Sequence, residues 1–297
     1  MNSDSLSSDL FLARRLAFDL QVDYPGLFHR LPVRPTRVAK ALGFRVVRRT
    51  NFHQRAQLEL FKTEDNKTSV TIVLEEHLDP QVGRFAVAHE IGHALLIQSN
   101  PKVLRDWTVT RRERFANLFA SEVLVPHSSR HEIEADFRET KSARDILKLA
   151  ARIGLSVHAL FTLADRHPQW WIGLNKILLR IKYVPNARTG FGTTFRIVSA
   201  HYDRGNFFVP LNQSMKSFCG NDDWLRCAQI GVEAHRSATI LLKRRRPFSE
   251  TPRFVGTSEA ARLSAVRLRT KLNGRESYFV ALVDFRPKPD VSEPVLD

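Results

Sequence analysis

The stretch Arg84-Phe-Ala-Val-Ala-His-Glu-Ile-Gly-His-Ala-Leu-Leu-Ile97 decides the fold of this chain, because it places a His-Glu-x-x-His pattern within an apolar helix. Residues four apart lie on one face of an α-helix, so His89 and His93 can bind one metal ion. Glu90 lies about 100° round the helix from His89, where it can take a proton from a water at that ion. This spacing is typical of a zinc hydrolase with two histidine ligands and a glutamate base.

The residues around the pattern favour a helix. Asp79 and Pro80 upstream supply an N-cap and a favourable first helical position. Apolar residues recur at spacings of three and four: Phe85, Ala88, Ile91, Ala94 and Leu95. Two histidines that only fill a hydrophobic core are the alternative interpretation of the pattern.

Short strands precede this helix. Residues 44–49 have the composition of a strand, and residues 56–63 and 69–75 alternate apolar and polar side chains around residues 64–67, which predicts a hairpin. Amphipathic spacing also predicts helices over residues 10–20 and 36–43. A small sheet that leads into a His-Glu-x-x-His helix is the zincin layout, in which the edge strand pairs with the substrate backbone.

A second helix is predicted over Arg111–Leu124, ended by Pro126. Zinc in a hydrolytic site takes three protein ligands, so this helix should supply the third, from Glu113 or Glu122. Small residues share the face of Glu113, and Glu122 lies about half a turn from that face. We therefore favour Glu113, with Glu122 as the alternative ligand or as a solvated or capping charge. Asn117, one turn after Glu113, can hydrogen-bond a ligand histidine.

The two helices carry a resemblance to a known family. Arg84-Phe-Ala-Val-Ala-His-Glu-Ile-Gly-His-Ala-Leu-Leu96 and Glu113-Arg-Phe-Ala-Asn-Leu-Phe-Ala-Ser-Glu-Val-Leu-Val-Pro126 resemble the signature of the ImmA/IrrE metallo-endopeptidases, over about residues 1–165. Phe115 departs from the pattern, because many members have a second glutamate there. The family typically inactivates a transcriptional repressor by cleavage, in a stress or mobile-element response. By position, the resemblance implies one zinc ion at His89, His93 and Glu113, the general base at Glu90 and a supporting amide at Asn117.

Composition indicates a globular protein. The chain has 297 residues, 43% of them hydrophobic and 26% charged, which leaves room for two domains. Cys219 and Cys227 show no metal-site spacing and indicate packing roles in a reducing compartment. The amino terminus lacks a signal-peptide pattern, and no segment reaches about 18 consecutive apolar residues. We therefore expect a soluble cytoplasmic protein with no membrane partner.

The net charge of +15 is unevenly distributed. Residues 1–168 hold 25 Lys and Arg against 20 Asp and Glu, a net of +5, whereas residues 169–297 hold 21 against 11, a net of +10. A field of this sign attracts nucleic acid or acidic protein, and it also keeps a chain soluble. The sharpest basic run, Lys243-Arg-Arg-Arg246, is by default a solvated strand end, so we expect only weak, non-specific nucleic-acid binding.

Residues 127–167 are predicted to be helical. An apolar stripe runs through residues 141–153, and another helix opens after Gly154. Two helices across such a turn suggest a helix-turn-helix, but the family resemblance implies that this segment packs under the active site. His127 and His131 lie four apart, either as cleft residues that polarise a carbonyl or as surface histidines.

The sequence after Trp170 predicts antiparallel strands. Alternating segments flank turn sequences at residues 185–190 and at Asn273-Gly274. The strand number suggests a small sensory architecture similar to GAF or PAS domains. We therefore expect two domains, a zincin-like metallopeptidase domain at residues 1–168 and a β-rich regulatory or recognition domain at residues 169–297.

The expected fold class is α+β, with a small sheet, the His-Glu-x-x-His helix and a helical bundle ahead of the antiparallel sheet. The expected function is zinc-dependent hydrolysis of a peptide bond in an intracellular protein. Two alternatives remain open at this point. One is a DNA-binding regulator with a structural or vestigial metal site, and the other is a toxin–antitoxin or phage-derived interaction module.

Overall fold

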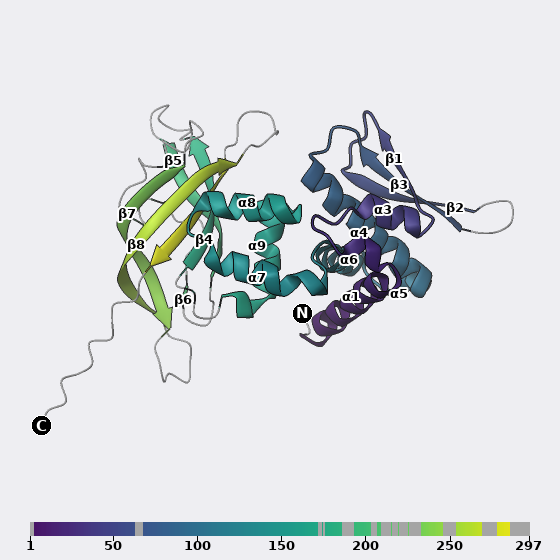
Figure 1. The fold of residues 1–297 in the computed structure, drawn as a ribbon, viewed down its shortest axis with the longest axis horizontal. Helices are drawn as coiled ribbons and strands as arrows, with labels where there is room; N and C mark the ends of the chain where they lie inside the picture. Colours follow the sequence, from purple (N-terminus) through teal and green to yellow (C-terminus); the bar gives the residue numbers. More distant parts are fainter. Residues whose placement is uncertain are drawn as a thin grey trace, which may run out of the picture. The chain divides into compact units, whose positions relative to one another are not determined.

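The computed structural model describes residues 3–62, 68–171, 174, 176–185, 193–202, 207–208, 215, 219, 225, 233–245, 254–268 and 278–285 (Figure 1). The fold class is α+β, as the sequence predicts. Contacts between residues divide the chain into two compact units. Unit 1 comprises Met1–Glu134 and Leu149–Leu160, and unit 2 comprises Ala135–Lys148 and Phe161–Asp297.

Unit 1 contains a three-stranded sheet and most of the helices. Its strands are β1 (Arg45–Arg49), β2 (Ala56–Lys62) and β3 (Thr68–Glu75). Its helices are α1 (Ser3–Asp23), α2 (Pro25–Phe28), α3 (Pro35–Ala41), α4 (Pro80–Ser99), α5 (Val103–Asp106) and α6 (Val109–Leu124), followed by a 3-10 turn at His127–Ser129. The helices α7 (Arg130–Glu139), α8 (Ala143–Ile153) and α9 (Val157–Arg166) each contribute residues to both units.

The small sheet has the order β1-β3-β2, so β2 lies at one edge. Strand β1 runs parallel to β3, and β2 runs antiparallel to it, with Leu58 opposite Ile72. The predicted hairpin is therefore confirmed, although its turn at residues 63–67 lies outside the described part of the chain. Every side chain of β3 from Val70 to Leu74 is buried, so this central strand is shielded from solvent on both faces.

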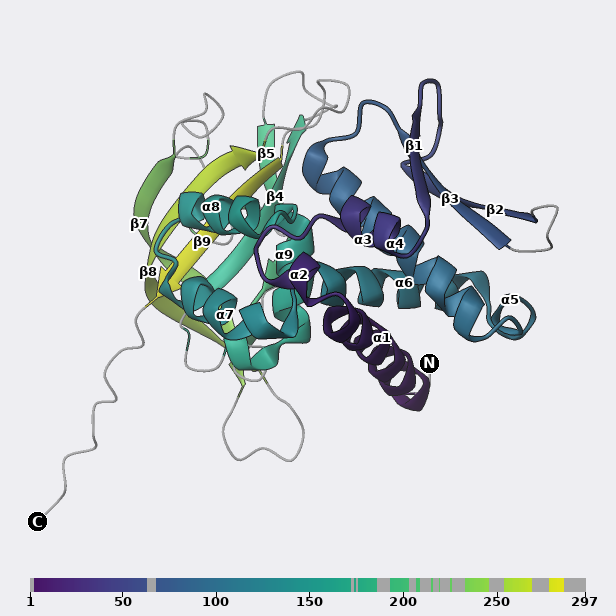
Figure 2. The same ribbon diagram turned by 45° about the vertical axis from the view of Figure 1, so that its right-hand side comes forward.

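Unit 1 is layered (Figure 2). The three-stranded sheet is followed by α3 and α4, then by α6, and then by α1. Helix α4 contacts β2 and β3 as well as α6, so it is the central helix of the unit. As predicted, α4 begins after Asp79, whose side chain accepts a hydrogen bond from the backbone N–H of Gln81 at 2.9 Å, and has Pro80 as its first residue.

Helices α4 and α6 approach closely at Gly92. A Cβ atom built at Gly92 would lie 2.9 Å from Cδ1 of Phe119 in α6, which is shorter than a normal carbon–carbon contact. Phe115 and Phe119 fill the space beside the small residues Ala116 and Ala120, and all four are fully buried. The absence of a side chain at position 92 therefore sets the distance between the two helices.

Buried acidic residues attach α6 to its neighbours. Asp9 of α1 has a fully buried carboxylate that accepts hydrogen bonds from Arg111 at 2.9 Å and from Arg114. Glu122 of α6 is also buried and pairs with Arg14 and Arg130. The expectation that Glu122 is a solvated or capping charge is wrong, because α1 and α7 bring arginines to it.

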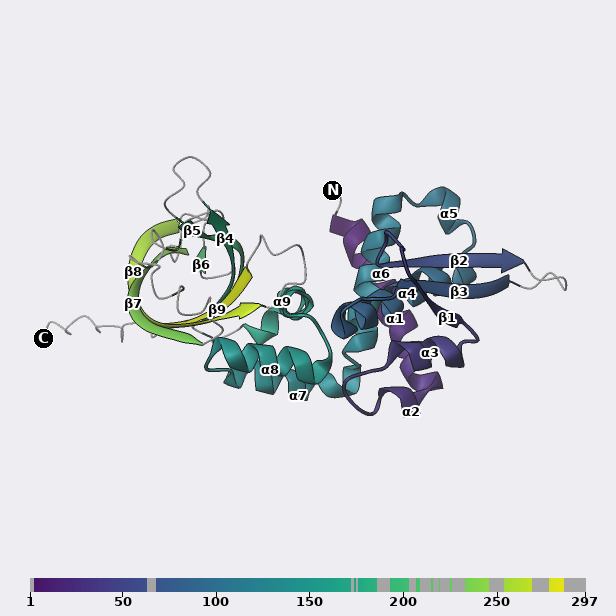
Figure 3. The ribbon, with the colours of Figure 1, turned by 90° about the horizontal axis from the view of Figure 1, so that it is seen from above.

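Unit 2 is built on an antiparallel sheet with the order β5-β4-β9-β8-β7-β6. The strands are β4 (Lys176–Pro185), β5 (Thr193–His201), β6 (Phe207–Phe208), β7 (Ala234–Arg245), β8 (Phe254–Leu268) and β9 (Tyr278–Phe285). Figure 3 shows that this sheet curves strongly, and alternate side chains of its strands, such as Leu179, Phe279 and Val283, enclose a hydrophobic core. The predicted pairings of β4 with β5 and of β8 with β9 are confirmed, although both turn sequences lie outside the described residues.

Helix α8 begins on this sheet. The backbone N–H of Ala143 donates to Oγ of Ser264 in β8 at 2.6 Å, and Ser264 donates to Glu233 at 2.8 Å. Glu233 also accepts from the backbone N–H of Arg144 at 3.0 Å. These contacts place residues 135–148 in unit 2. The domain boundary at residue 168 and the likeness of the sheet to GAF or PAS domains remain predictions.

No single helix in the described residues is both long enough and apolar enough to cross a membrane. Helices α8 and α9 pass that test only as a pair, by length and composition, and they are bent by 89° at the break between them.

The contact at Gly92 predicts the effect of a single methyl group. Gly92→Ala should lower the free energy of unfolding by about 1–3 kcal/mol, because the new methyl group overlaps the buried Phe119 ring. Gly83→Ala in the same helix is the matched control, since its Cβ would meet only Leu78 at 4.0 Å. This control should be neutral or slightly stabilising. Urea unfolding followed by circular dichroism measures both variants, and equal stabilities would contradict the proposed packing constraint.

Candidate metal centre

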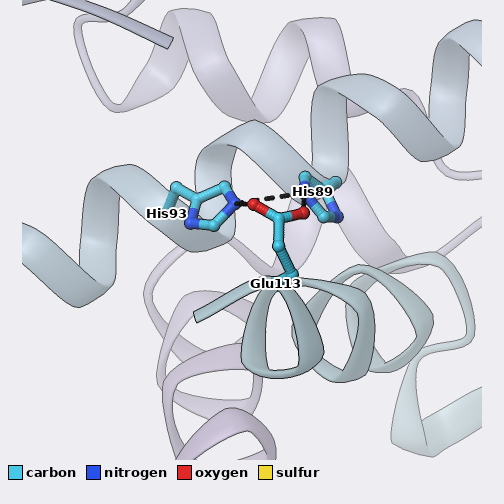
Figure 4. Close-up of side chains that lie close together, drawn as sticks. All are labelled: His89, His93 and Glu113. Atoms are coloured by element: carbon cyan, nitrogen blue, oxygen red, sulfur yellow. Dashed lines mark hydrogen bonds and ion pairs between the residues drawn. The ribbon is translucent and has the colours of Figure 1, made fainter. Parts of the chain in front are cut away.

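Three side chains from two helices converge on one point (Figure 4). His89 and His93 project from α4, and Glu113 reaches toward them from α6. The Nε2 atoms of the two histidines are 3.1 Å apart. One carboxylate oxygen of Glu113 lies 3.2 Å from Nε2 of His89, and the other lies 3.2 Å from Nε2 of His93. The three groups thus present three potential ligand atoms to the same small volume.

The spacing of these atoms fits zinc. Ligand atoms about 2.0–2.1 Å from a tetrahedral ion lie about 3.3 Å from one another, close to the separations in this cluster. Two imidazoles and a carboxylate are also a donor set that catalytic zinc uses. The residues present therefore suit a zinc ion by both distance and chemistry.

Burial keeps both histidines in the form that binds metal. It lowers the pKa of His89, and it lowers the pKa of His93 to about 4, where the neighbouring His89 contributes in the same direction. Both imidazoles are therefore neutral near pH 7 and offer a lone pair without first losing a proton.

Asn117 orients one of the histidines. Its Oδ1 lies 3.1 Å from Nδ1 of His89, one turn of α6 beyond Glu113. An amide oxygen can only accept, so this contact requires the hydrogen of His89 on Nδ1 and leaves the lone pair of Nε2 toward Glu113. The same helix therefore supplies both a potential ligand and the group that fixes a tautomer.

Glu90 is buried beside this cluster. Burial raises its pKa to about 7, and the negative charge of Glu113 adds to the increase. The backbone N–H of Leu58 in β2 donates a hydrogen bond to Glu90, which partly offsets the cost of ionisation. A carboxyl group with a pKa near neutrality can both accept and return a proton at physiological pH.

Solvent reaches the cluster from the side of α6. The Glu113 side chain is 53% exposed, whereas those of His89 and His93 are 14% and 16% exposed. The cluster is therefore in contact with solvent on this side.

The structure distinguishes among the candidate site residues that the sequence could not decide between. Glu113 faces the two histidines, and Glu122 is held in ion pairs on another part of α6. His127 and His131 are exposed, and neither belongs to a potential metal-binding group among the described residues. The roles of Gly92 and Leu58 could not be predicted from the sequence, since the absence of a side chain and a backbone N–H give no signal in a residue pattern.

The pKa of Glu90 predicts a pH-dependent stability of the metal-free protein. Between pH 4.5 and about 7 the folded state keeps a proton that the unfolded state loses, so the contribution of Glu90 to stability falls as pH rises. Glu90→Gln should therefore gain stability relative to the parent protein across this window. Urea unfolding in EDTA at several pH values measures the difference, and parallel pH profiles for the two proteins would contradict the raised pKa.

Comparisons with known proteins agree with the two helical motifs. Residues 39–161 match the family model of the IrrE N-terminal-like domain, a peptidase family, and this segment contains both α4 and α6. A solved structure titled "Mycobacterium tuberculosis transcriptional regulator" aligns with a TM-score of 0.49 and 16% identity, covering 94% of this chain and 88% of that chain. No curated protein sequence matches the chain. Residues 39–161 therefore form an IrrE N-terminal-like domain, as the resemblance to the ImmA/IrrE peptidases implies.

Proposed function

We propose that the chain is a zinc-dependent endopeptidase in which His89, His93 and Glu113 hold the metal and Glu90 is the general base. The convergence of three neutral or anionic donors within 4.8 Å of one another carries this proposal. A cation at this point would be within reach of a lone pair from each of the three groups. The peptidase family of residues 39–161 supports the same conclusion.

Zinc bound there would lower the pKa of a water molecule and polarise a peptide carbonyl. Glu90 supplies the proton transfers. As a carboxylate it takes the proton from the attacking water, and as a carboxylic acid it gives that proton to the leaving nitrogen. In the metal-free protein the pKa of Glu90 is about 7, so neither form of the side chain is strongly favoured near neutral pH.

The position of β2 supports a peptide substrate. In the order β1-β3-β2, β3 is the only described strand that pairs with β2, so the other edge of β2 can accept an extended segment. Leu58 of β2 contacts Glu90 through its backbone N–H. A peptide that added to this edge as a strand would therefore place its backbone beside the general base.

The substrate that we propose is a transcriptional repressor in the same cell. Support comes from the ImmA/IrrE family, whose members typically inactivate such repressors, and from the IrrE N-terminal-like domain of this chain. An exposed loop or linker of a folded repressor would fit the open edge of β2, because an extended segment is needed for strand addition. We also propose that the protein acts in the cytoplasm.

A nucleic-acid role rests on charge alone. The basic residues Lys243–Arg245 lie in the last part of β7, and Arg246 lies outside the described residues. Their backbones pair with β8, and two of them also pair with β6, which matches the expected strand end. Weak, non-specific nucleic-acid binding through the carboxy-terminal half remains a prediction, as does the alternative of an interaction module with a vestigial metal site.

The ligand assignment predicts the zinc content of four variants. His89→Ala and His93→Ala should lose stoichiometric zinc, whereas Glu90→Gln should retain it, because Glu90 is a base and not a ligand. Asn117→Ala should weaken zinc affinity about 10–100-fold through the loss of its contact with His89. Metal analysis after gel filtration and competition with a chelator measure these effects. If Glu90→Gln lost as much zinc as His89→Ala and His93→Ala, the assignment of Glu90 as a base and not a ligand would be refuted.

Glu113→Gln and Glu122→Gln form a matched pair on one helix. Glu113→Gln should weaken zinc binding with little change in stability, because its side chain is half-exposed. Glu122→Gln should retain zinc and lower the free energy of unfolding by about 1–3 kcal/mol, because it weakens ion pairs of a buried carboxylate. The reverse pattern would transfer the ligand role to Glu122.

The proposed reaction predicts new protein termini. The zinc-loaded protein should create a specific new amino terminus in a repressor when it is incubated with a lysate of its own cell. Glu90→Gln should create none, because the proton acceptor is lost. Amino-terminal labelling followed by mass spectrometry detects the product. A cleavage that occurs equally with Glu90→Gln would belong to another protease and would contradict the mechanism.

A further inference from the structure

The exposed face of α1 is apolar. The phenyl rings of Phe11 and Phe18 are 69% and 53% exposed, and Val22 is 59% exposed. At about 100° per residue, the three side chains lie within an arc of about 40° on one face of the helix. Ser8 and Arg15 are exposed on the same face, so the exposed positions alternate in spacings of three and four. This spacing is the a/d repeat of a helix that packs against another helix.

This face does not take part in the core of unit 1. The opposite face of α1 carries Ala13, Ala17 and Leu20, all buried, and α1 contacts α6. Asp9 and Arg14 fix the orientation of α1 through their ion pairs with α6. Rotating the helix to bury the phenylalanines would break those pairs, so the apolar face needs a separate partner.

We propose that the face of Ser8, Phe11, Arg15, Phe18 and Val22 binds the same face of α1 in a second copy of the chain, with the two helices antiparallel. In an antiparallel pair that matches a positions with d positions, Phe11 meets Val22 of the other copy, and Arg15 meets Phe18. Each apolar residue of the stripe is then covered. The guanidinium group of Arg15 lies against a phenyl ring, which is a favourable cation–π arrangement.

Charge selects the antiparallel orientation. Arg15 and Asp19 are both exposed, and their side chains lie 3.9 Å apart in one helix. In a parallel pair, Arg15 would face Arg15 of the other copy in the centre of the interface, and the like charges would repel. In the antiparallel pair, Arg15 lies at the level of Asp19 of the other copy and on the same side, so opposite charges meet. The stripe is therefore self-complementary in only one of the two orientations.

The charge of α1 also disfavours a membrane as the partner. The helix contains four aspartates and two arginines, a net charge of −2. Helices that lie on anionic membranes carry an excess of basic residues on their polar face. An acidic helix with a narrow apolar stripe fits a second helix better than a lipid surface.

The size of this face predicts weak association. One face of a helix is smaller than a standard protein interface, so we expect a dissociation constant on the order of 10–100 µM. Sedimentation velocity of the full-length protein over a matching concentration range should show a reversible monomer–dimer equilibrium. Phe18→Ser and Phe11→Ser should each weaken dimerisation about tenfold or more, because they remove the central apolar contacts.

Leu104→Ser is the control for surface hydrophobicity, since Leu104 is an exposed apolar residue of α5 and lies outside the stripe. It should leave dimerisation unchanged. Thermal unfolding of every variant checks that α1 remains folded, which its exposed positions allow. Co-sedimentation with phosphatidylserine vesicles tests whether α1 binds a membrane instead of a second copy.

Charge reversal tests the orientation. Arg15→Glu alone and Asp19→Arg alone should each weaken the dimer, because like charges then meet across the interface. The double variant Arg15→Glu/Asp19→Arg should dimerise more tightly than either single variant, because opposite charges meet again, although the contact of the Arg15 guanidinium with the Phe18 ring is lost. Four outcomes would each overturn the proposal. These are a chain that stays monomeric at the highest concentration, a dimer insensitive to Phe18→Ser, a double variant that dimerises no more tightly than the single variants, and vesicle binding by a monomer.

Discussion

The candidate metal centre depends on how closely α4 can approach α6. His89 and His93 share a face of α4 by helical periodicity alone, but Glu113 reaches them only because α6 lies against that helix. Gly92 permits the approach, since the ring of Phe119 occupies the space that a side chain would need. A larger separation would leave the two histidines without a third donor. The glycine at position 92 thus allows the candidate metal centre to form.

Burial shifts the pKa values of the site residues in opposite directions. The low-dielectric surroundings disfavour every charged form, so the pKa of both histidines falls and that of Glu90 rises. The proposed ligands are therefore neutral imidazoles, and the proposed base has a pKa near 7. Asn117 and the backbone of Leu58 complete the arrangement by hydrogen bonds to His89 and Glu90.

Ion pairs near both ends of α6 hold this arrangement in place and leave one apolar face of α1 exposed. Asp9 of α1 pairs with arginines of α6, and Glu122 of α6 pairs with arginines of α1 and α7, so α6 cannot slide or rotate without exposing buried charge. The same contacts fix the orientation of α1. They bury the face of α1 that carries Ala13 and Ala17, and they leave Phe11 and Phe18 exposed. This exposure is the basis for the proposed contact between two copies.

The sequence by itself determined the local features: the His-Glu-x-x-His helix with its Asp79 cap, the hairpin of β2 and β3 and the paired strands of the second half. Such features follow from backbone periodicity and short-range hydrogen bonds, which a residue pattern records directly. Only the tertiary structure brought Glu113 to the histidines, buried Glu122 among arginines and exposed the phenylalanines of α1. Those outcomes depend on which helix faces pack together, and that choice is made by contacts between residues far apart in the chain.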